Sequence, residues 1–400
     1  MENLIRTSRR LVGMVQMETF RYLYDEINWE DRLIMIKGAR GVGKTTMLLQ
    51  RIREKFGASG TALYASCDNL WFADNKIVDL VAYHYDHGGT HLYLDEIHRY
   101  SGNWQRELKN IYDSYPDYHV VFTGSSMIHL DSALADLSRR CLPYRLFGLS
   151  FREYLKFEGV ADFPALSLED VLDESHKAEL EIVDCVPGKV LAHFEKYLGR
   201  SYYPFYNSGS AGEYYGRIER LIDTSITQDI PAVENVEYET LHKLGRLLYV
   251  MSTDVPFTLN VQSLSQKIQV SRNTVIKMFE LLDKGGIVRC IHSGWRSPKS
   301  VAKPDKILFD NTDVMAALSS LNDIGTVRET FVASMLSQRH KVYEPPTGDF
   351  LVDEKYLLEV GGATKTFRQV ADIPDSYVVV DGIETGLAKK IPLWLFGFLY

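Results

Sequence analysis

A glycine-rich turn that leads into a lysine and two threonines is the clearest chemical feature of the sequence. Gly38, Gly43, Lys44 and Thr45 fit the pattern G-x-x-x-x-G-K-[ST], in which backbone N–H groups curl around phosphate oxygens. The lysine of such loops reaches the β- and γ-phosphates, and the next hydroxyl is a ligand for Mg²⁺. The sequence therefore predicts an ATP and Mg²⁺ site at Gly38, Ala39, Arg40, Gly41, Val42, Gly43, Lys44, Thr45 and Thr46.

Two adjacent acids, Asp95 and Glu96, follow the mostly apolar run 91–94. Asp95 is expected, with Thr45, to hold the Mg²⁺ shell, and Glu96 to act as the general base that polarises the attacking water. A strand that ends in two acids is weak evidence by itself. The phosphate-binding turn upstream makes the catalytic interpretation stronger than the structural one.

Polar side chains also follow the apolar run 120–122. Thr123, Ser125 or Ser126 is expected either to contact the γ-phosphate or the water, or simply to cap the next helix. Further on, Arg139 and Arg140 have two equally weighted interpretations. One of them reaches the nucleotide of a neighbouring subunit, which implies a homo-oligomer, or both are a solvated surface pair.

Three segments with helical hydrophobic spacing, followed by two expected strands, predict a winged helix in the second half of the chain. The segments cover 238–251, 261–268 and 271–282, and the strands are expected at 287–291 and 306–309. In this arrangement the third helix enters a major groove of DNA.

Positive charge is concentrated in the same segment, although the whole chain has a net charge of −8. Residues 262–306 contain nine Lys or Arg and three Asp or Glu, and nine minus three gives +6. This asymmetry is typical of a surface that contacts the phosphate backbone of duplex DNA. The expected contacts are Arg272, Asn273, Lys277, Arg289 and Arg296. The alternative is a winged helix that contacts only protein.

The elements that must position these residues predict an α/β fold class with several domains. The apolar runs 33–36, 62–65, 91–94 and 120–122 read as buried strands, and Leu11 to Ile27 reads as a helix. We expect four regions, at 1–155, at 156–235, at 236–322 (the winged helix) and at 323–400 (a small α/β unit). The family resemblance given below implies that the first is a three-layer αβα P-loop ATPase core and the second a helical lid. Ile391 to Tyr400 reads as a buried terminal strand.

Composition is that of a globular protein without structural metal or disulfides. The chain has 400 residues, of which 45% are hydrophobic and 24% charged. Its cysteines are far apart and form no C-x-x-C, which favours a reducing cytoplasm: Cys67, Cys141, Cys185 and Cys290. Because no apolar stretch is long enough to span a bilayer, no membrane association is expected.

The order of these motifs resembles one family of AAA-type ATPases found in bacteria and archaea. The resemblance is carried by G-A-R-G-V-G-K-T-T, L-Y-L-D-E-I-H, F-T-G-S-S and R-L-F-G-L-S-F-R-E-Y-L, and it covers residues 15 to 155 strongly. It implies Lys44 and Thr45 on phosphate and Mg²⁺, Asp95 on the metal and Glu96 as catalytic base. It also suggests Ser125 as a polar sensor and Arg139 or Arg140 as the arginine finger.

Three acids near the end of the chain resemble the restriction-endonuclease-like fold, which uses such carboxylates to hold Mg²⁺. They are Glu329, Asp349 and Glu359. The motif of that fold also requires a lysine two residues after the last acid, where this chain has Gly361. Although Lys355 or Lys365 can substitute from nearby, a degenerate unit that does not cut DNA is the favoured interpretation.

We therefore expect an ATP-hydrolysing machine or switch whose ATP state sets its affinity for DNA. The first alternative is a nuclease effector in which the ATPase gates cutting by the C-terminal unit. The second is a protein-remodelling or signalling ATPase that makes no DNA contact.

Overall fold

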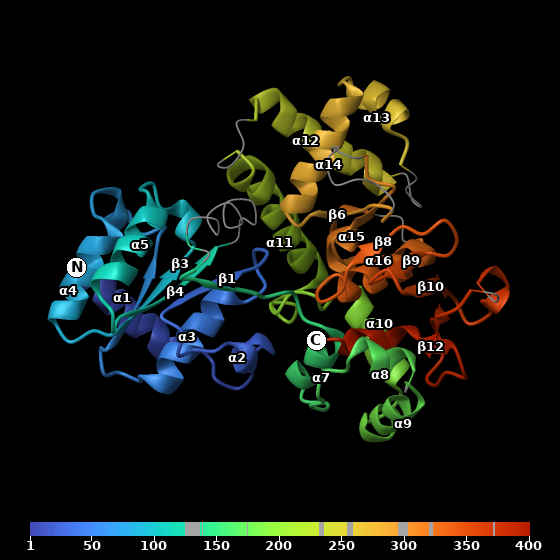
Figure 1. Cartoon of the computed structure of the whole chain (residues 1–400), viewed down its shortest axis with the longest axis horizontal. Coiled ribbons are helices and arrows are strands. Elements are labelled where there is room, and N and C mark those ends of the chain that lie inside the picture. Colours follow the sequence, from blue (N-terminus) through green and yellow to red (C-terminus); the bar gives the residue numbers. More distant parts are fainter. Residues whose placement is uncertain are drawn as a thin grey trace. The chain divides into compact units, whose positions relative to one another are not determined.

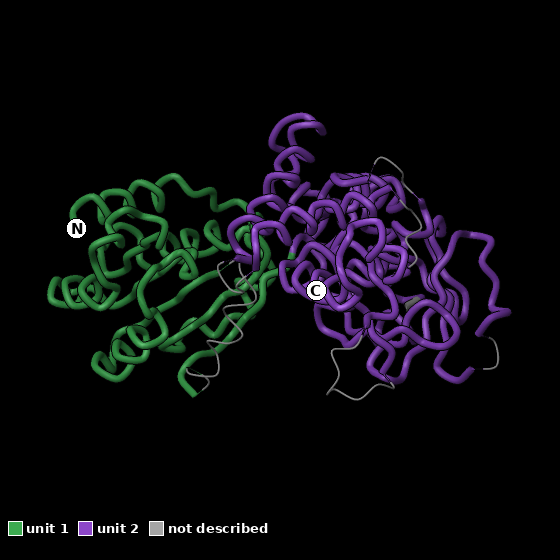
Figure 2. The backbone as a smooth tube through the Cα atoms, turned by 90° about the horizontal axis from the view of Figure 1, so that it is seen from above, with its two compact units in different colours: residues 1–147 green, residues 148–400 purple. Residues whose placement is uncertain are grey.

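The computed structural model describes residues 1–124, 137, 139–173, 175–231, 236–253, 259–294, 303–319, 323–370 and 373–400. Over these residues the chain divides into two compact units, Met1–Phe147 and Gly148–Tyr400, which Figure 2 colours green and purple. Each unit contains a five-stranded sheet of its own.

The sheet of the first unit consists of five parallel strands (Figure 1). In chain order they are β1 (Leu33–Lys37), β2 (Ala62–Ser66), β3 (His91–Asp95), β4 (His119–Gly124) and β5 (Leu142–Arg145). Their spatial order is β2-β3-β4-β1-β5. The four predicted strands of this unit are confirmed. They read as continuous apolar runs because helices bury both faces of a parallel sheet.

Helices cover this sheet and complete the first unit. On one face, α4 (Ile77–Asp86) and α5 (Trp104–Ser114) pack against the strands through Leu80 and Leu108. The helices α1 (Glu2–Met14) and α3 (Lys44–Lys55) contact each other and β2. The remaining elements are short: α2 (Leu23–Glu26), η1 (Leu70–Ala73) and η2 (Ile97–Arg99).

The predicted helix over 11–27 is wrong, because α1 ends at Met14 and α2 begins at Leu23. Val15 is already extended, with φ −65° and ψ 137°. The buried Gln50 side chain of α3 donates to the carbonyls of Gln16 and Thr19 at 2.9 Å each. The Gln50 side chain thus provides hydrogen bonds to these two carbonyls, which would otherwise have to be made within a helix.

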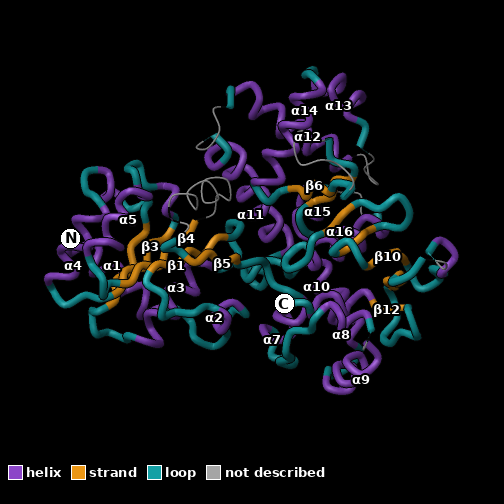
Figure 3. The backbone as a smooth tube through the Cα atoms, in the orientation of Figure 1, coloured by secondary structure: helices purple, strands orange, loops and turns teal. Residues whose placement is uncertain are grey.

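The second unit begins with five helices and one π-helical turn, all drawn as helix in Figure 3. They are α7 (Phe151–Phe157), α8 (Leu168–Leu172), α9 (Ser175–Cys185), α10 (Val190–Gly199), α11 (Ala211–Thr224) and η3 (Ser225–Asp229).

Three helices and an antiparallel pair of strands follow, at the positions that the sequence predicts. They are α12 (Tyr238–Thr253), α13 (Val261–Ile268), α14 (Arg272–Lys284), β6 (Val288–Ile291) and β7 (Lys306–Phe309). The Ser271 hydroxyl accepts a 3.1 Å hydrogen bond from the Thr274 N–H and so begins α14.

The C-terminal part of this unit is a mixed sheet in the order β12-β11-β10-β9-β8. Two helices, α15 (Thr312–Leu318) and α16 (Ile324–Leu336), precede the strands β8 (Val342–Tyr343), β9 (Phe350–Val352), β10 (Tyr356–Gly361), β11 (Ser376–Val380) and β12 (Lys390–Pro392). The 3₁₀ segments η4 (Phe367–Gln369) and η5 (Leu393–Phe398) complete it.

The predicted terminal strand is wrong for residues 393–398, which are buried but form the 3₁₀ helix η5. Phe398 lies 5.9 Å from the ring of Phe151 and 5.7 Å from that of Phe163. Phe151 in turn lies 5.2 Å from Phe194 on α10. Aromatic packing against Phe151 and Phe163 thus holds the end of the chain. The apolar run alone did not distinguish this packing from pairing with a sheet.

Candidate active site

The glycine-rich turn joins β1 to α3 and has glycine where other residues would be strained or would clash. Gly41 and Gly43 have φ angles of 82° and 100°, in the left-handed region that glycine adopts without penalty. Gly38 has a different reason, since a Cβ there would lie 2.2 Å from the carbonyl oxygen of Leu146.

Lys44 lies inside this turn, with 4% of its surface exposed. Its Nζ donates to the carbonyl oxygens of Gly38 at 2.8 Å and Ala39 at 2.9 Å. Thr45 and Thr46 are exposed at the first turn of α3, and Val42 is buried. The ammonium is therefore held by neutral carbonyls, which phosphate oxygens can replace with a gain in charge pairing.

Sequence reasoning missed Arg21, which fixes this turn from outside it. The side chain is 4% exposed and donates to the carbonyl of Val42 and, at 2.7 Å, to that of Phe147. It thereby joins the turn to the end of the segment that follows β5. No local pattern around Arg21 signals this role.

Asp95 lies at the carboxyl end of β3 and is 2% exposed. The hydroxyls of Thr45 at 2.5 Å and Tyr64 at 2.9 Å donate to its Oδ2, and the Thr123 hydroxyl donates to its Oδ1. Burial, together with the nearby charge of Asp95, raises the pKa of Tyr64, so this phenol stays a donor. The carboxylate is buried among neutral donors.

Glu96, the predicted base, has a left-handed backbone with φ 55°. Its Oε2 lies 3.2 Å from His98 Nε2 and 3.6 Å from a guanidinium nitrogen of Arg40. Its N–H donates to the Thr123 hydroxyl at 3.2 Å. Thr123 thus positions both acids. The parallel strands bring Thr45, Asp95, Glu96 and Thr123 together at one edge of the sheet, where ligands of such sheets bind.

The remaining predicted catalytic residues are Ser125 or Ser126 and an arginine, Arg139 or Arg140. Ser125 and Ser126 lie outside the described residues. Arg140 forms two hydrogen bonds, of 3.0 and 3.2 Å, with the carboxylate of Asp113 on α5. A role for Arg140 toward another copy of the chain stays a prediction.

The predicted DNA contacts separate into two groups. Arg272, Asn273 and Lys277 are exposed on α14. Arg289 is only 13% exposed, and its guanidinium pairs with Asp310 Oδ1 at 2.7 Å. Arg296 lies outside the described residues.

In the second unit, lysines lie among the acids that the sequence singled out. Lys306 Nζ lies 2.7 Å from Glu329 and 3.9 Å from both Glu344 and Asp349. Burial raises the pKa of Glu329 and of Glu344, whereas burial of Lys306 is outweighed by these carboxylates, which raise its pKa. Glu344 and Lys306 were not predicted for this cluster. It brings together residues that lie far apart in the sequence.

Lys365 occupies the space left open by Gly361. Its ammonium pairs with Glu359 Oε1, and a Cβ on Gly361 would lie 2.7 Å from its Cγ and Cδ. Asp349 Oδ2 accepts from the Val360 N–H at 2.7 Å.

Among the described residues no three His, Cys, Asp or Glu side chains converge as a metal site. We call Glu329, Glu344, Asp349, Glu359, Lys306 and Lys365 the carboxylate–lysine cluster.

In the described part of the chain, every helix is too short or too polar to cross a lipid bilayer.

Comparisons with known proteins find two family matches and a protein similar over most of this chain. Residues 30–155 match the family described as AAA domain, and residues 191–324 match a domain of unknown function, DUF8612. The uncharacterized protein MJ1637 of Methanocaldococcus jannaschii is 29% identical over 394 residues, which cover 91% of this chain and 82% of that protein.

Two similar solved structures have low sequence identity to this chain. The AMPPCP-bound replication initiator DnaA of Aquifex aeolicus is 14% identical, covering 68% of this chain and 92% of that one, with a TM-score of 0.28. The Aeropyrum pernix ORC1 protein in complex with DNA is 13% identical, covering 79% and 91%, with a TM-score of 0.32. Residues 30–155, which include the glycine-rich turn and both acids at the end of β3, thus match the AAA domain family.

Proposed function

We propose that the chain binds and hydrolyses ATP, and that its nucleotide state controls contact with duplex DNA. The observation that carries the first part is the 2.5 Å hydrogen bond from Thr45 to Asp95, made beside Lys44 and Glu96. The bond joins the end of the phosphate-binding turn to the acid on β3. A hydroxyl and a carboxylate oxygen are ligands that suit Mg²⁺, which would neutralise phosphate charge.

Each residue of this site has a role in hydrolysis. Lys44 exchanges the carbonyls of Gly38 and Ala39 for phosphate oxygens and binds the nucleotide. The water oxygen attacks the γ-phosphorus while Glu96 accepts a proton from that water. The bond between the γ-phosphorus and the bridging β-phosphate oxygen breaks, which releases ADP. Arg40 and His98 hold the Glu96 carboxylate in place.

Exposed side chains on α14 support the DNA part of the proposal. Arg272, Asn273 and Lys277 stand on the third helix of the predicted winged helix, within the segment of net charge +6. Arg289 is not included, because Asp310 already pairs with it. Protein remodelling without DNA remains the alternative for this surface.

The test is ATP turnover and fluorescence anisotropy with labelled duplex DNA over a salt series. DNA should alter ATP turnover, and ATP should alter DNA affinity. Arg272→Ala and Lys277→Ala should each reduce the slope of log K against log[salt] by about 0.9, whereas Lys177→Ala, an exposed lysine on α9, should not. If wild type fails to bind DNA at low salt, the surface contacts protein instead.

A second candidate function, an ATP-gated nuclease, is favoured by Lys365. This lysine supplies a cation where the motif lacks one at Gly361. However, Lys306 is paired within the same cluster, and the carboxylates are neutralised from inside the protein. We therefore expect supercoiled plasmid to stay intact with Mg²⁺ or Mn²⁺ and ATP. Nicking that is lost in both Lys365→Ala and Asp349→Ala would establish the nuclease.

A further inference from the structure

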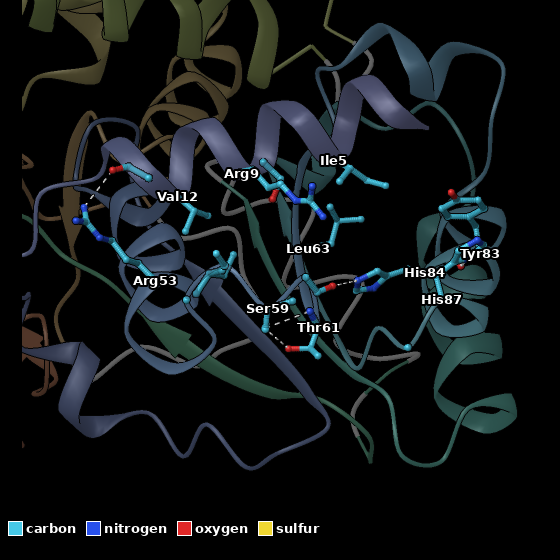
Figure 4. Close-up of a pocket in the computed structure, with 18 residues that line it drawn as sticks. Ile5, Arg9, Val12, Arg53, Ser59, Thr61, Leu63, Tyr83, His84 and His87 are labelled. Carbon is cyan, nitrogen blue, oxygen red and sulfur yellow. Dashed lines mark hydrogen bonds between the residues drawn. The ribbon is translucent and has the colours of Figure 1, made fainter.

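A cavity of about 690 Å³ lies in the first unit, away from the phosphate-binding turn (Figure 4). It is bordered by α1, the end of α3 with the loop that follows, the beginning of β2 and the end of α4. Ala62 and Leu63 at the amino end of β2 line it, whereas Ser66 at the other end of β2 is paired with Asp95. The cavity and the ATP site therefore lie at opposite edges of one sheet.

The charge of this cavity differs from that of the whole chain. Its 18 lining residues include Arg9, Arg53, His84 and His87 and no Asp or Glu, although the chain has a net charge of −8. The Arg53 guanidinium already forms hydrogen bonds within the protein, because it donates to the carbonyls of Gly13 and Val15. Arg9 is exposed, and the described part of the chain offers it no carboxylate partner.

The two histidines and Ser8 of the cavity wall form contacts within the protein. Burial lowers the pKa of His84, whose ring joins the Tyr118 hydroxyl at 2.7 Å to the Gly60 carbonyl at 3.1 Å. His87 stacks on Tyr83 with ring centroids 4.1 Å apart. The Ser8 hydroxyl accepts from the Tyr64 N–H at 3.0 Å. Arg9 is thus the charged group of the cavity that is left for a ligand.

The rest of the lining is mostly apolar, apart from the Ser59 and Thr61 hydroxyls, which lie 2.8 Å from each other. Val12, Ile52 and Leu63 are each less than 9% exposed and form a hydrophobic floor together with Ile5. A Cβ at Gly13 would have no atom within 4 Å. The volume falls within the range of roughly 300–1,000 Å³ that is usual for small-molecule sites.

We propose that this cavity binds a small organic anion with an apolar body. Its carboxylate, sulfonate or phosphate pairs with Arg9, and its apolar part packs on Ile5, Val12 and Leu63. Charge complementarity selects an anion because no acidic side chain lines the cavity, and the hydrophobic floor selects against a fully hydrated ion such as inorganic phosphate. The proposal does not depend on ATP hydrolysis, since none of these residues belongs to the ATP site.

The experiment uses the full chain and 1-anilinonaphthalene-8-sulfonate, which carries one sulfonate on an aromatic body, with saturating ATP present. We expect one saturable fluorescent site with a Kd on the order of 10 µM. Arg9→Glu should weaken binding at least tenfold. Arg10→Glu, a neighbouring exposed arginine on α1 that does not line the cavity, should leave the Kd unchanged.

Two further measurements separate a site from general surface binding. Gly13→Trp should abolish binding by filling the cavity, with the circular dichroism spectrum unchanged. Neutral N-phenyl-1-naphthylamine should bind wild type at least tenfold more weakly, and Arg9→Glu should not affect it. The proposal is overturned if wild type shows no saturable site, if Arg9→Glu and Gly13→Trp bind like wild type, or if the neutral probe binds equally well.

Discussion

The ATP site and the carboxylate–lysine cluster contain the same kinds of side chain in opposite arrangements. At the proposed ATP site, the Lys44 ammonium donates to backbone carbonyls and the Asp95 carboxylate accepts from hydroxyls, although Glu96 pairs with Arg40. In the cluster, Lys306 pairs directly with Glu329, and Lys365 with Glu359. The difference teaches that the first site is arranged for a charged ligand, whereas in the second the protein's own lysines balance the charge of the carboxylates.

This contrast has an energetic reason. Exchanging a neutral carbonyl for a phosphate oxygen adds a charge-assisted hydrogen bond. Opening an ion pair that is mostly buried leaves an uncompensated charge, which costs several kcal/mol unless a new ion replaces the lost one. We therefore expect substitutions at the ATP site to abolish function, and substitutions in the cluster to change stability first.

Glu96→Gln should have the largest effect. The amide cannot accept a proton from water, and the loss of a general base reduces turnover by roughly 10²–10⁴-fold. ATP binding should persist, because Lys44 and the glycine-rich turn are unchanged. Steady-state hydrolysis and an equilibrium nucleotide titration measure the two quantities. Normal turnover in this variant would mean that Glu96 is structural.

Lys44→Ala should weaken ATP binding at least about 10²-fold, since hydrogen bonds to charged groups contribute about 1.5–3 kcal/mol each. Lys55→Ala, at the exposed end of the same helix α3, is the matched control and should bind like wild type. Isothermal titration with ATP and Mg²⁺ gives both affinities. Equal affinities in the two variants would remove the basis for the ATP site.

Arg40→Ala should reduce kcat roughly 10-fold, with little change in ATP affinity. Arg40 lies 3.6 Å from Glu96 and 3.4 Å from the ring of His98, so its loss allows the base to leave its productive position. Arg40→Lys, which keeps the charge, should recover part of the rate. A loss of affinity without a loss of kcat would instead place Arg40 on the nucleotide.

Lys306→Met should have the smallest effect, a loss of roughly 1–2 kcal/mol in unfolding free energy at neutral pH. This is less than the cost of opening a fully buried pair, because the Lys306 and Glu329 side chains keep 20% and 26% of their surface exposed. Without the ammonium, burial keeps the pKa values of Glu329 and Glu344 raised, so the folded state binds more protons than the unfolded state. The stability of the variant should therefore rise as pH falls through those pKa values.

The measurement for Lys306→Met is the melting temperature at pH 7.5 and pH 5, with and without 10 mM Mg²⁺ as a working concentration. Mg²⁺ should stabilise the variant more than wild type, because it replaces the lost positive charge. Lys341→Met, which removes an exposed lysine beside β8, the edge strand of the C-terminal sheet, should show neither effect. An unchanged melting temperature at every condition would mean that the cluster does not depend on its internal cation.

The glycine-rich turn of the proposed ATP site was recognisable in the sequence because its pattern is local. The turn 38–43 and Lys44 are contiguous, and the strand and helix beside them have the required apolar runs. Asp95 and Glu96 were predictable for a related reason, since acids at the end of a buried strand reach the same edge of a parallel sheet as the turn. The strands of the first unit followed from their length and continuous hydrophobicity.

The partners of those residues were not predictable, because each contact joins segments far apart in the chain. Arg21 reaches Val42, and Tyr64 and Thr123 donate to Asp95, without any spacing that marks them. Arg289 is basic in the sequence but paired with Asp310 in the fold.

The C-terminal region shows the same division between local pattern and long-range packing. Residues 393–398 are apolar enough for a strand, yet packing on Phe151 and Phe163 leaves them as a 3₁₀ helix. The sequence identified Glu329, Asp349 and Glu359 as a group and Gly361 as a gap in their motif. It named Lys365 as one substitute, but only side-chain packing could show that Lys365 fills that gap and that Lys306 comes from β7 to meet Glu329. Side-chain charge and hydrophobic period are properties of neighbours in the chain, whereas the pairing of a charge depends on which distant element packs against it.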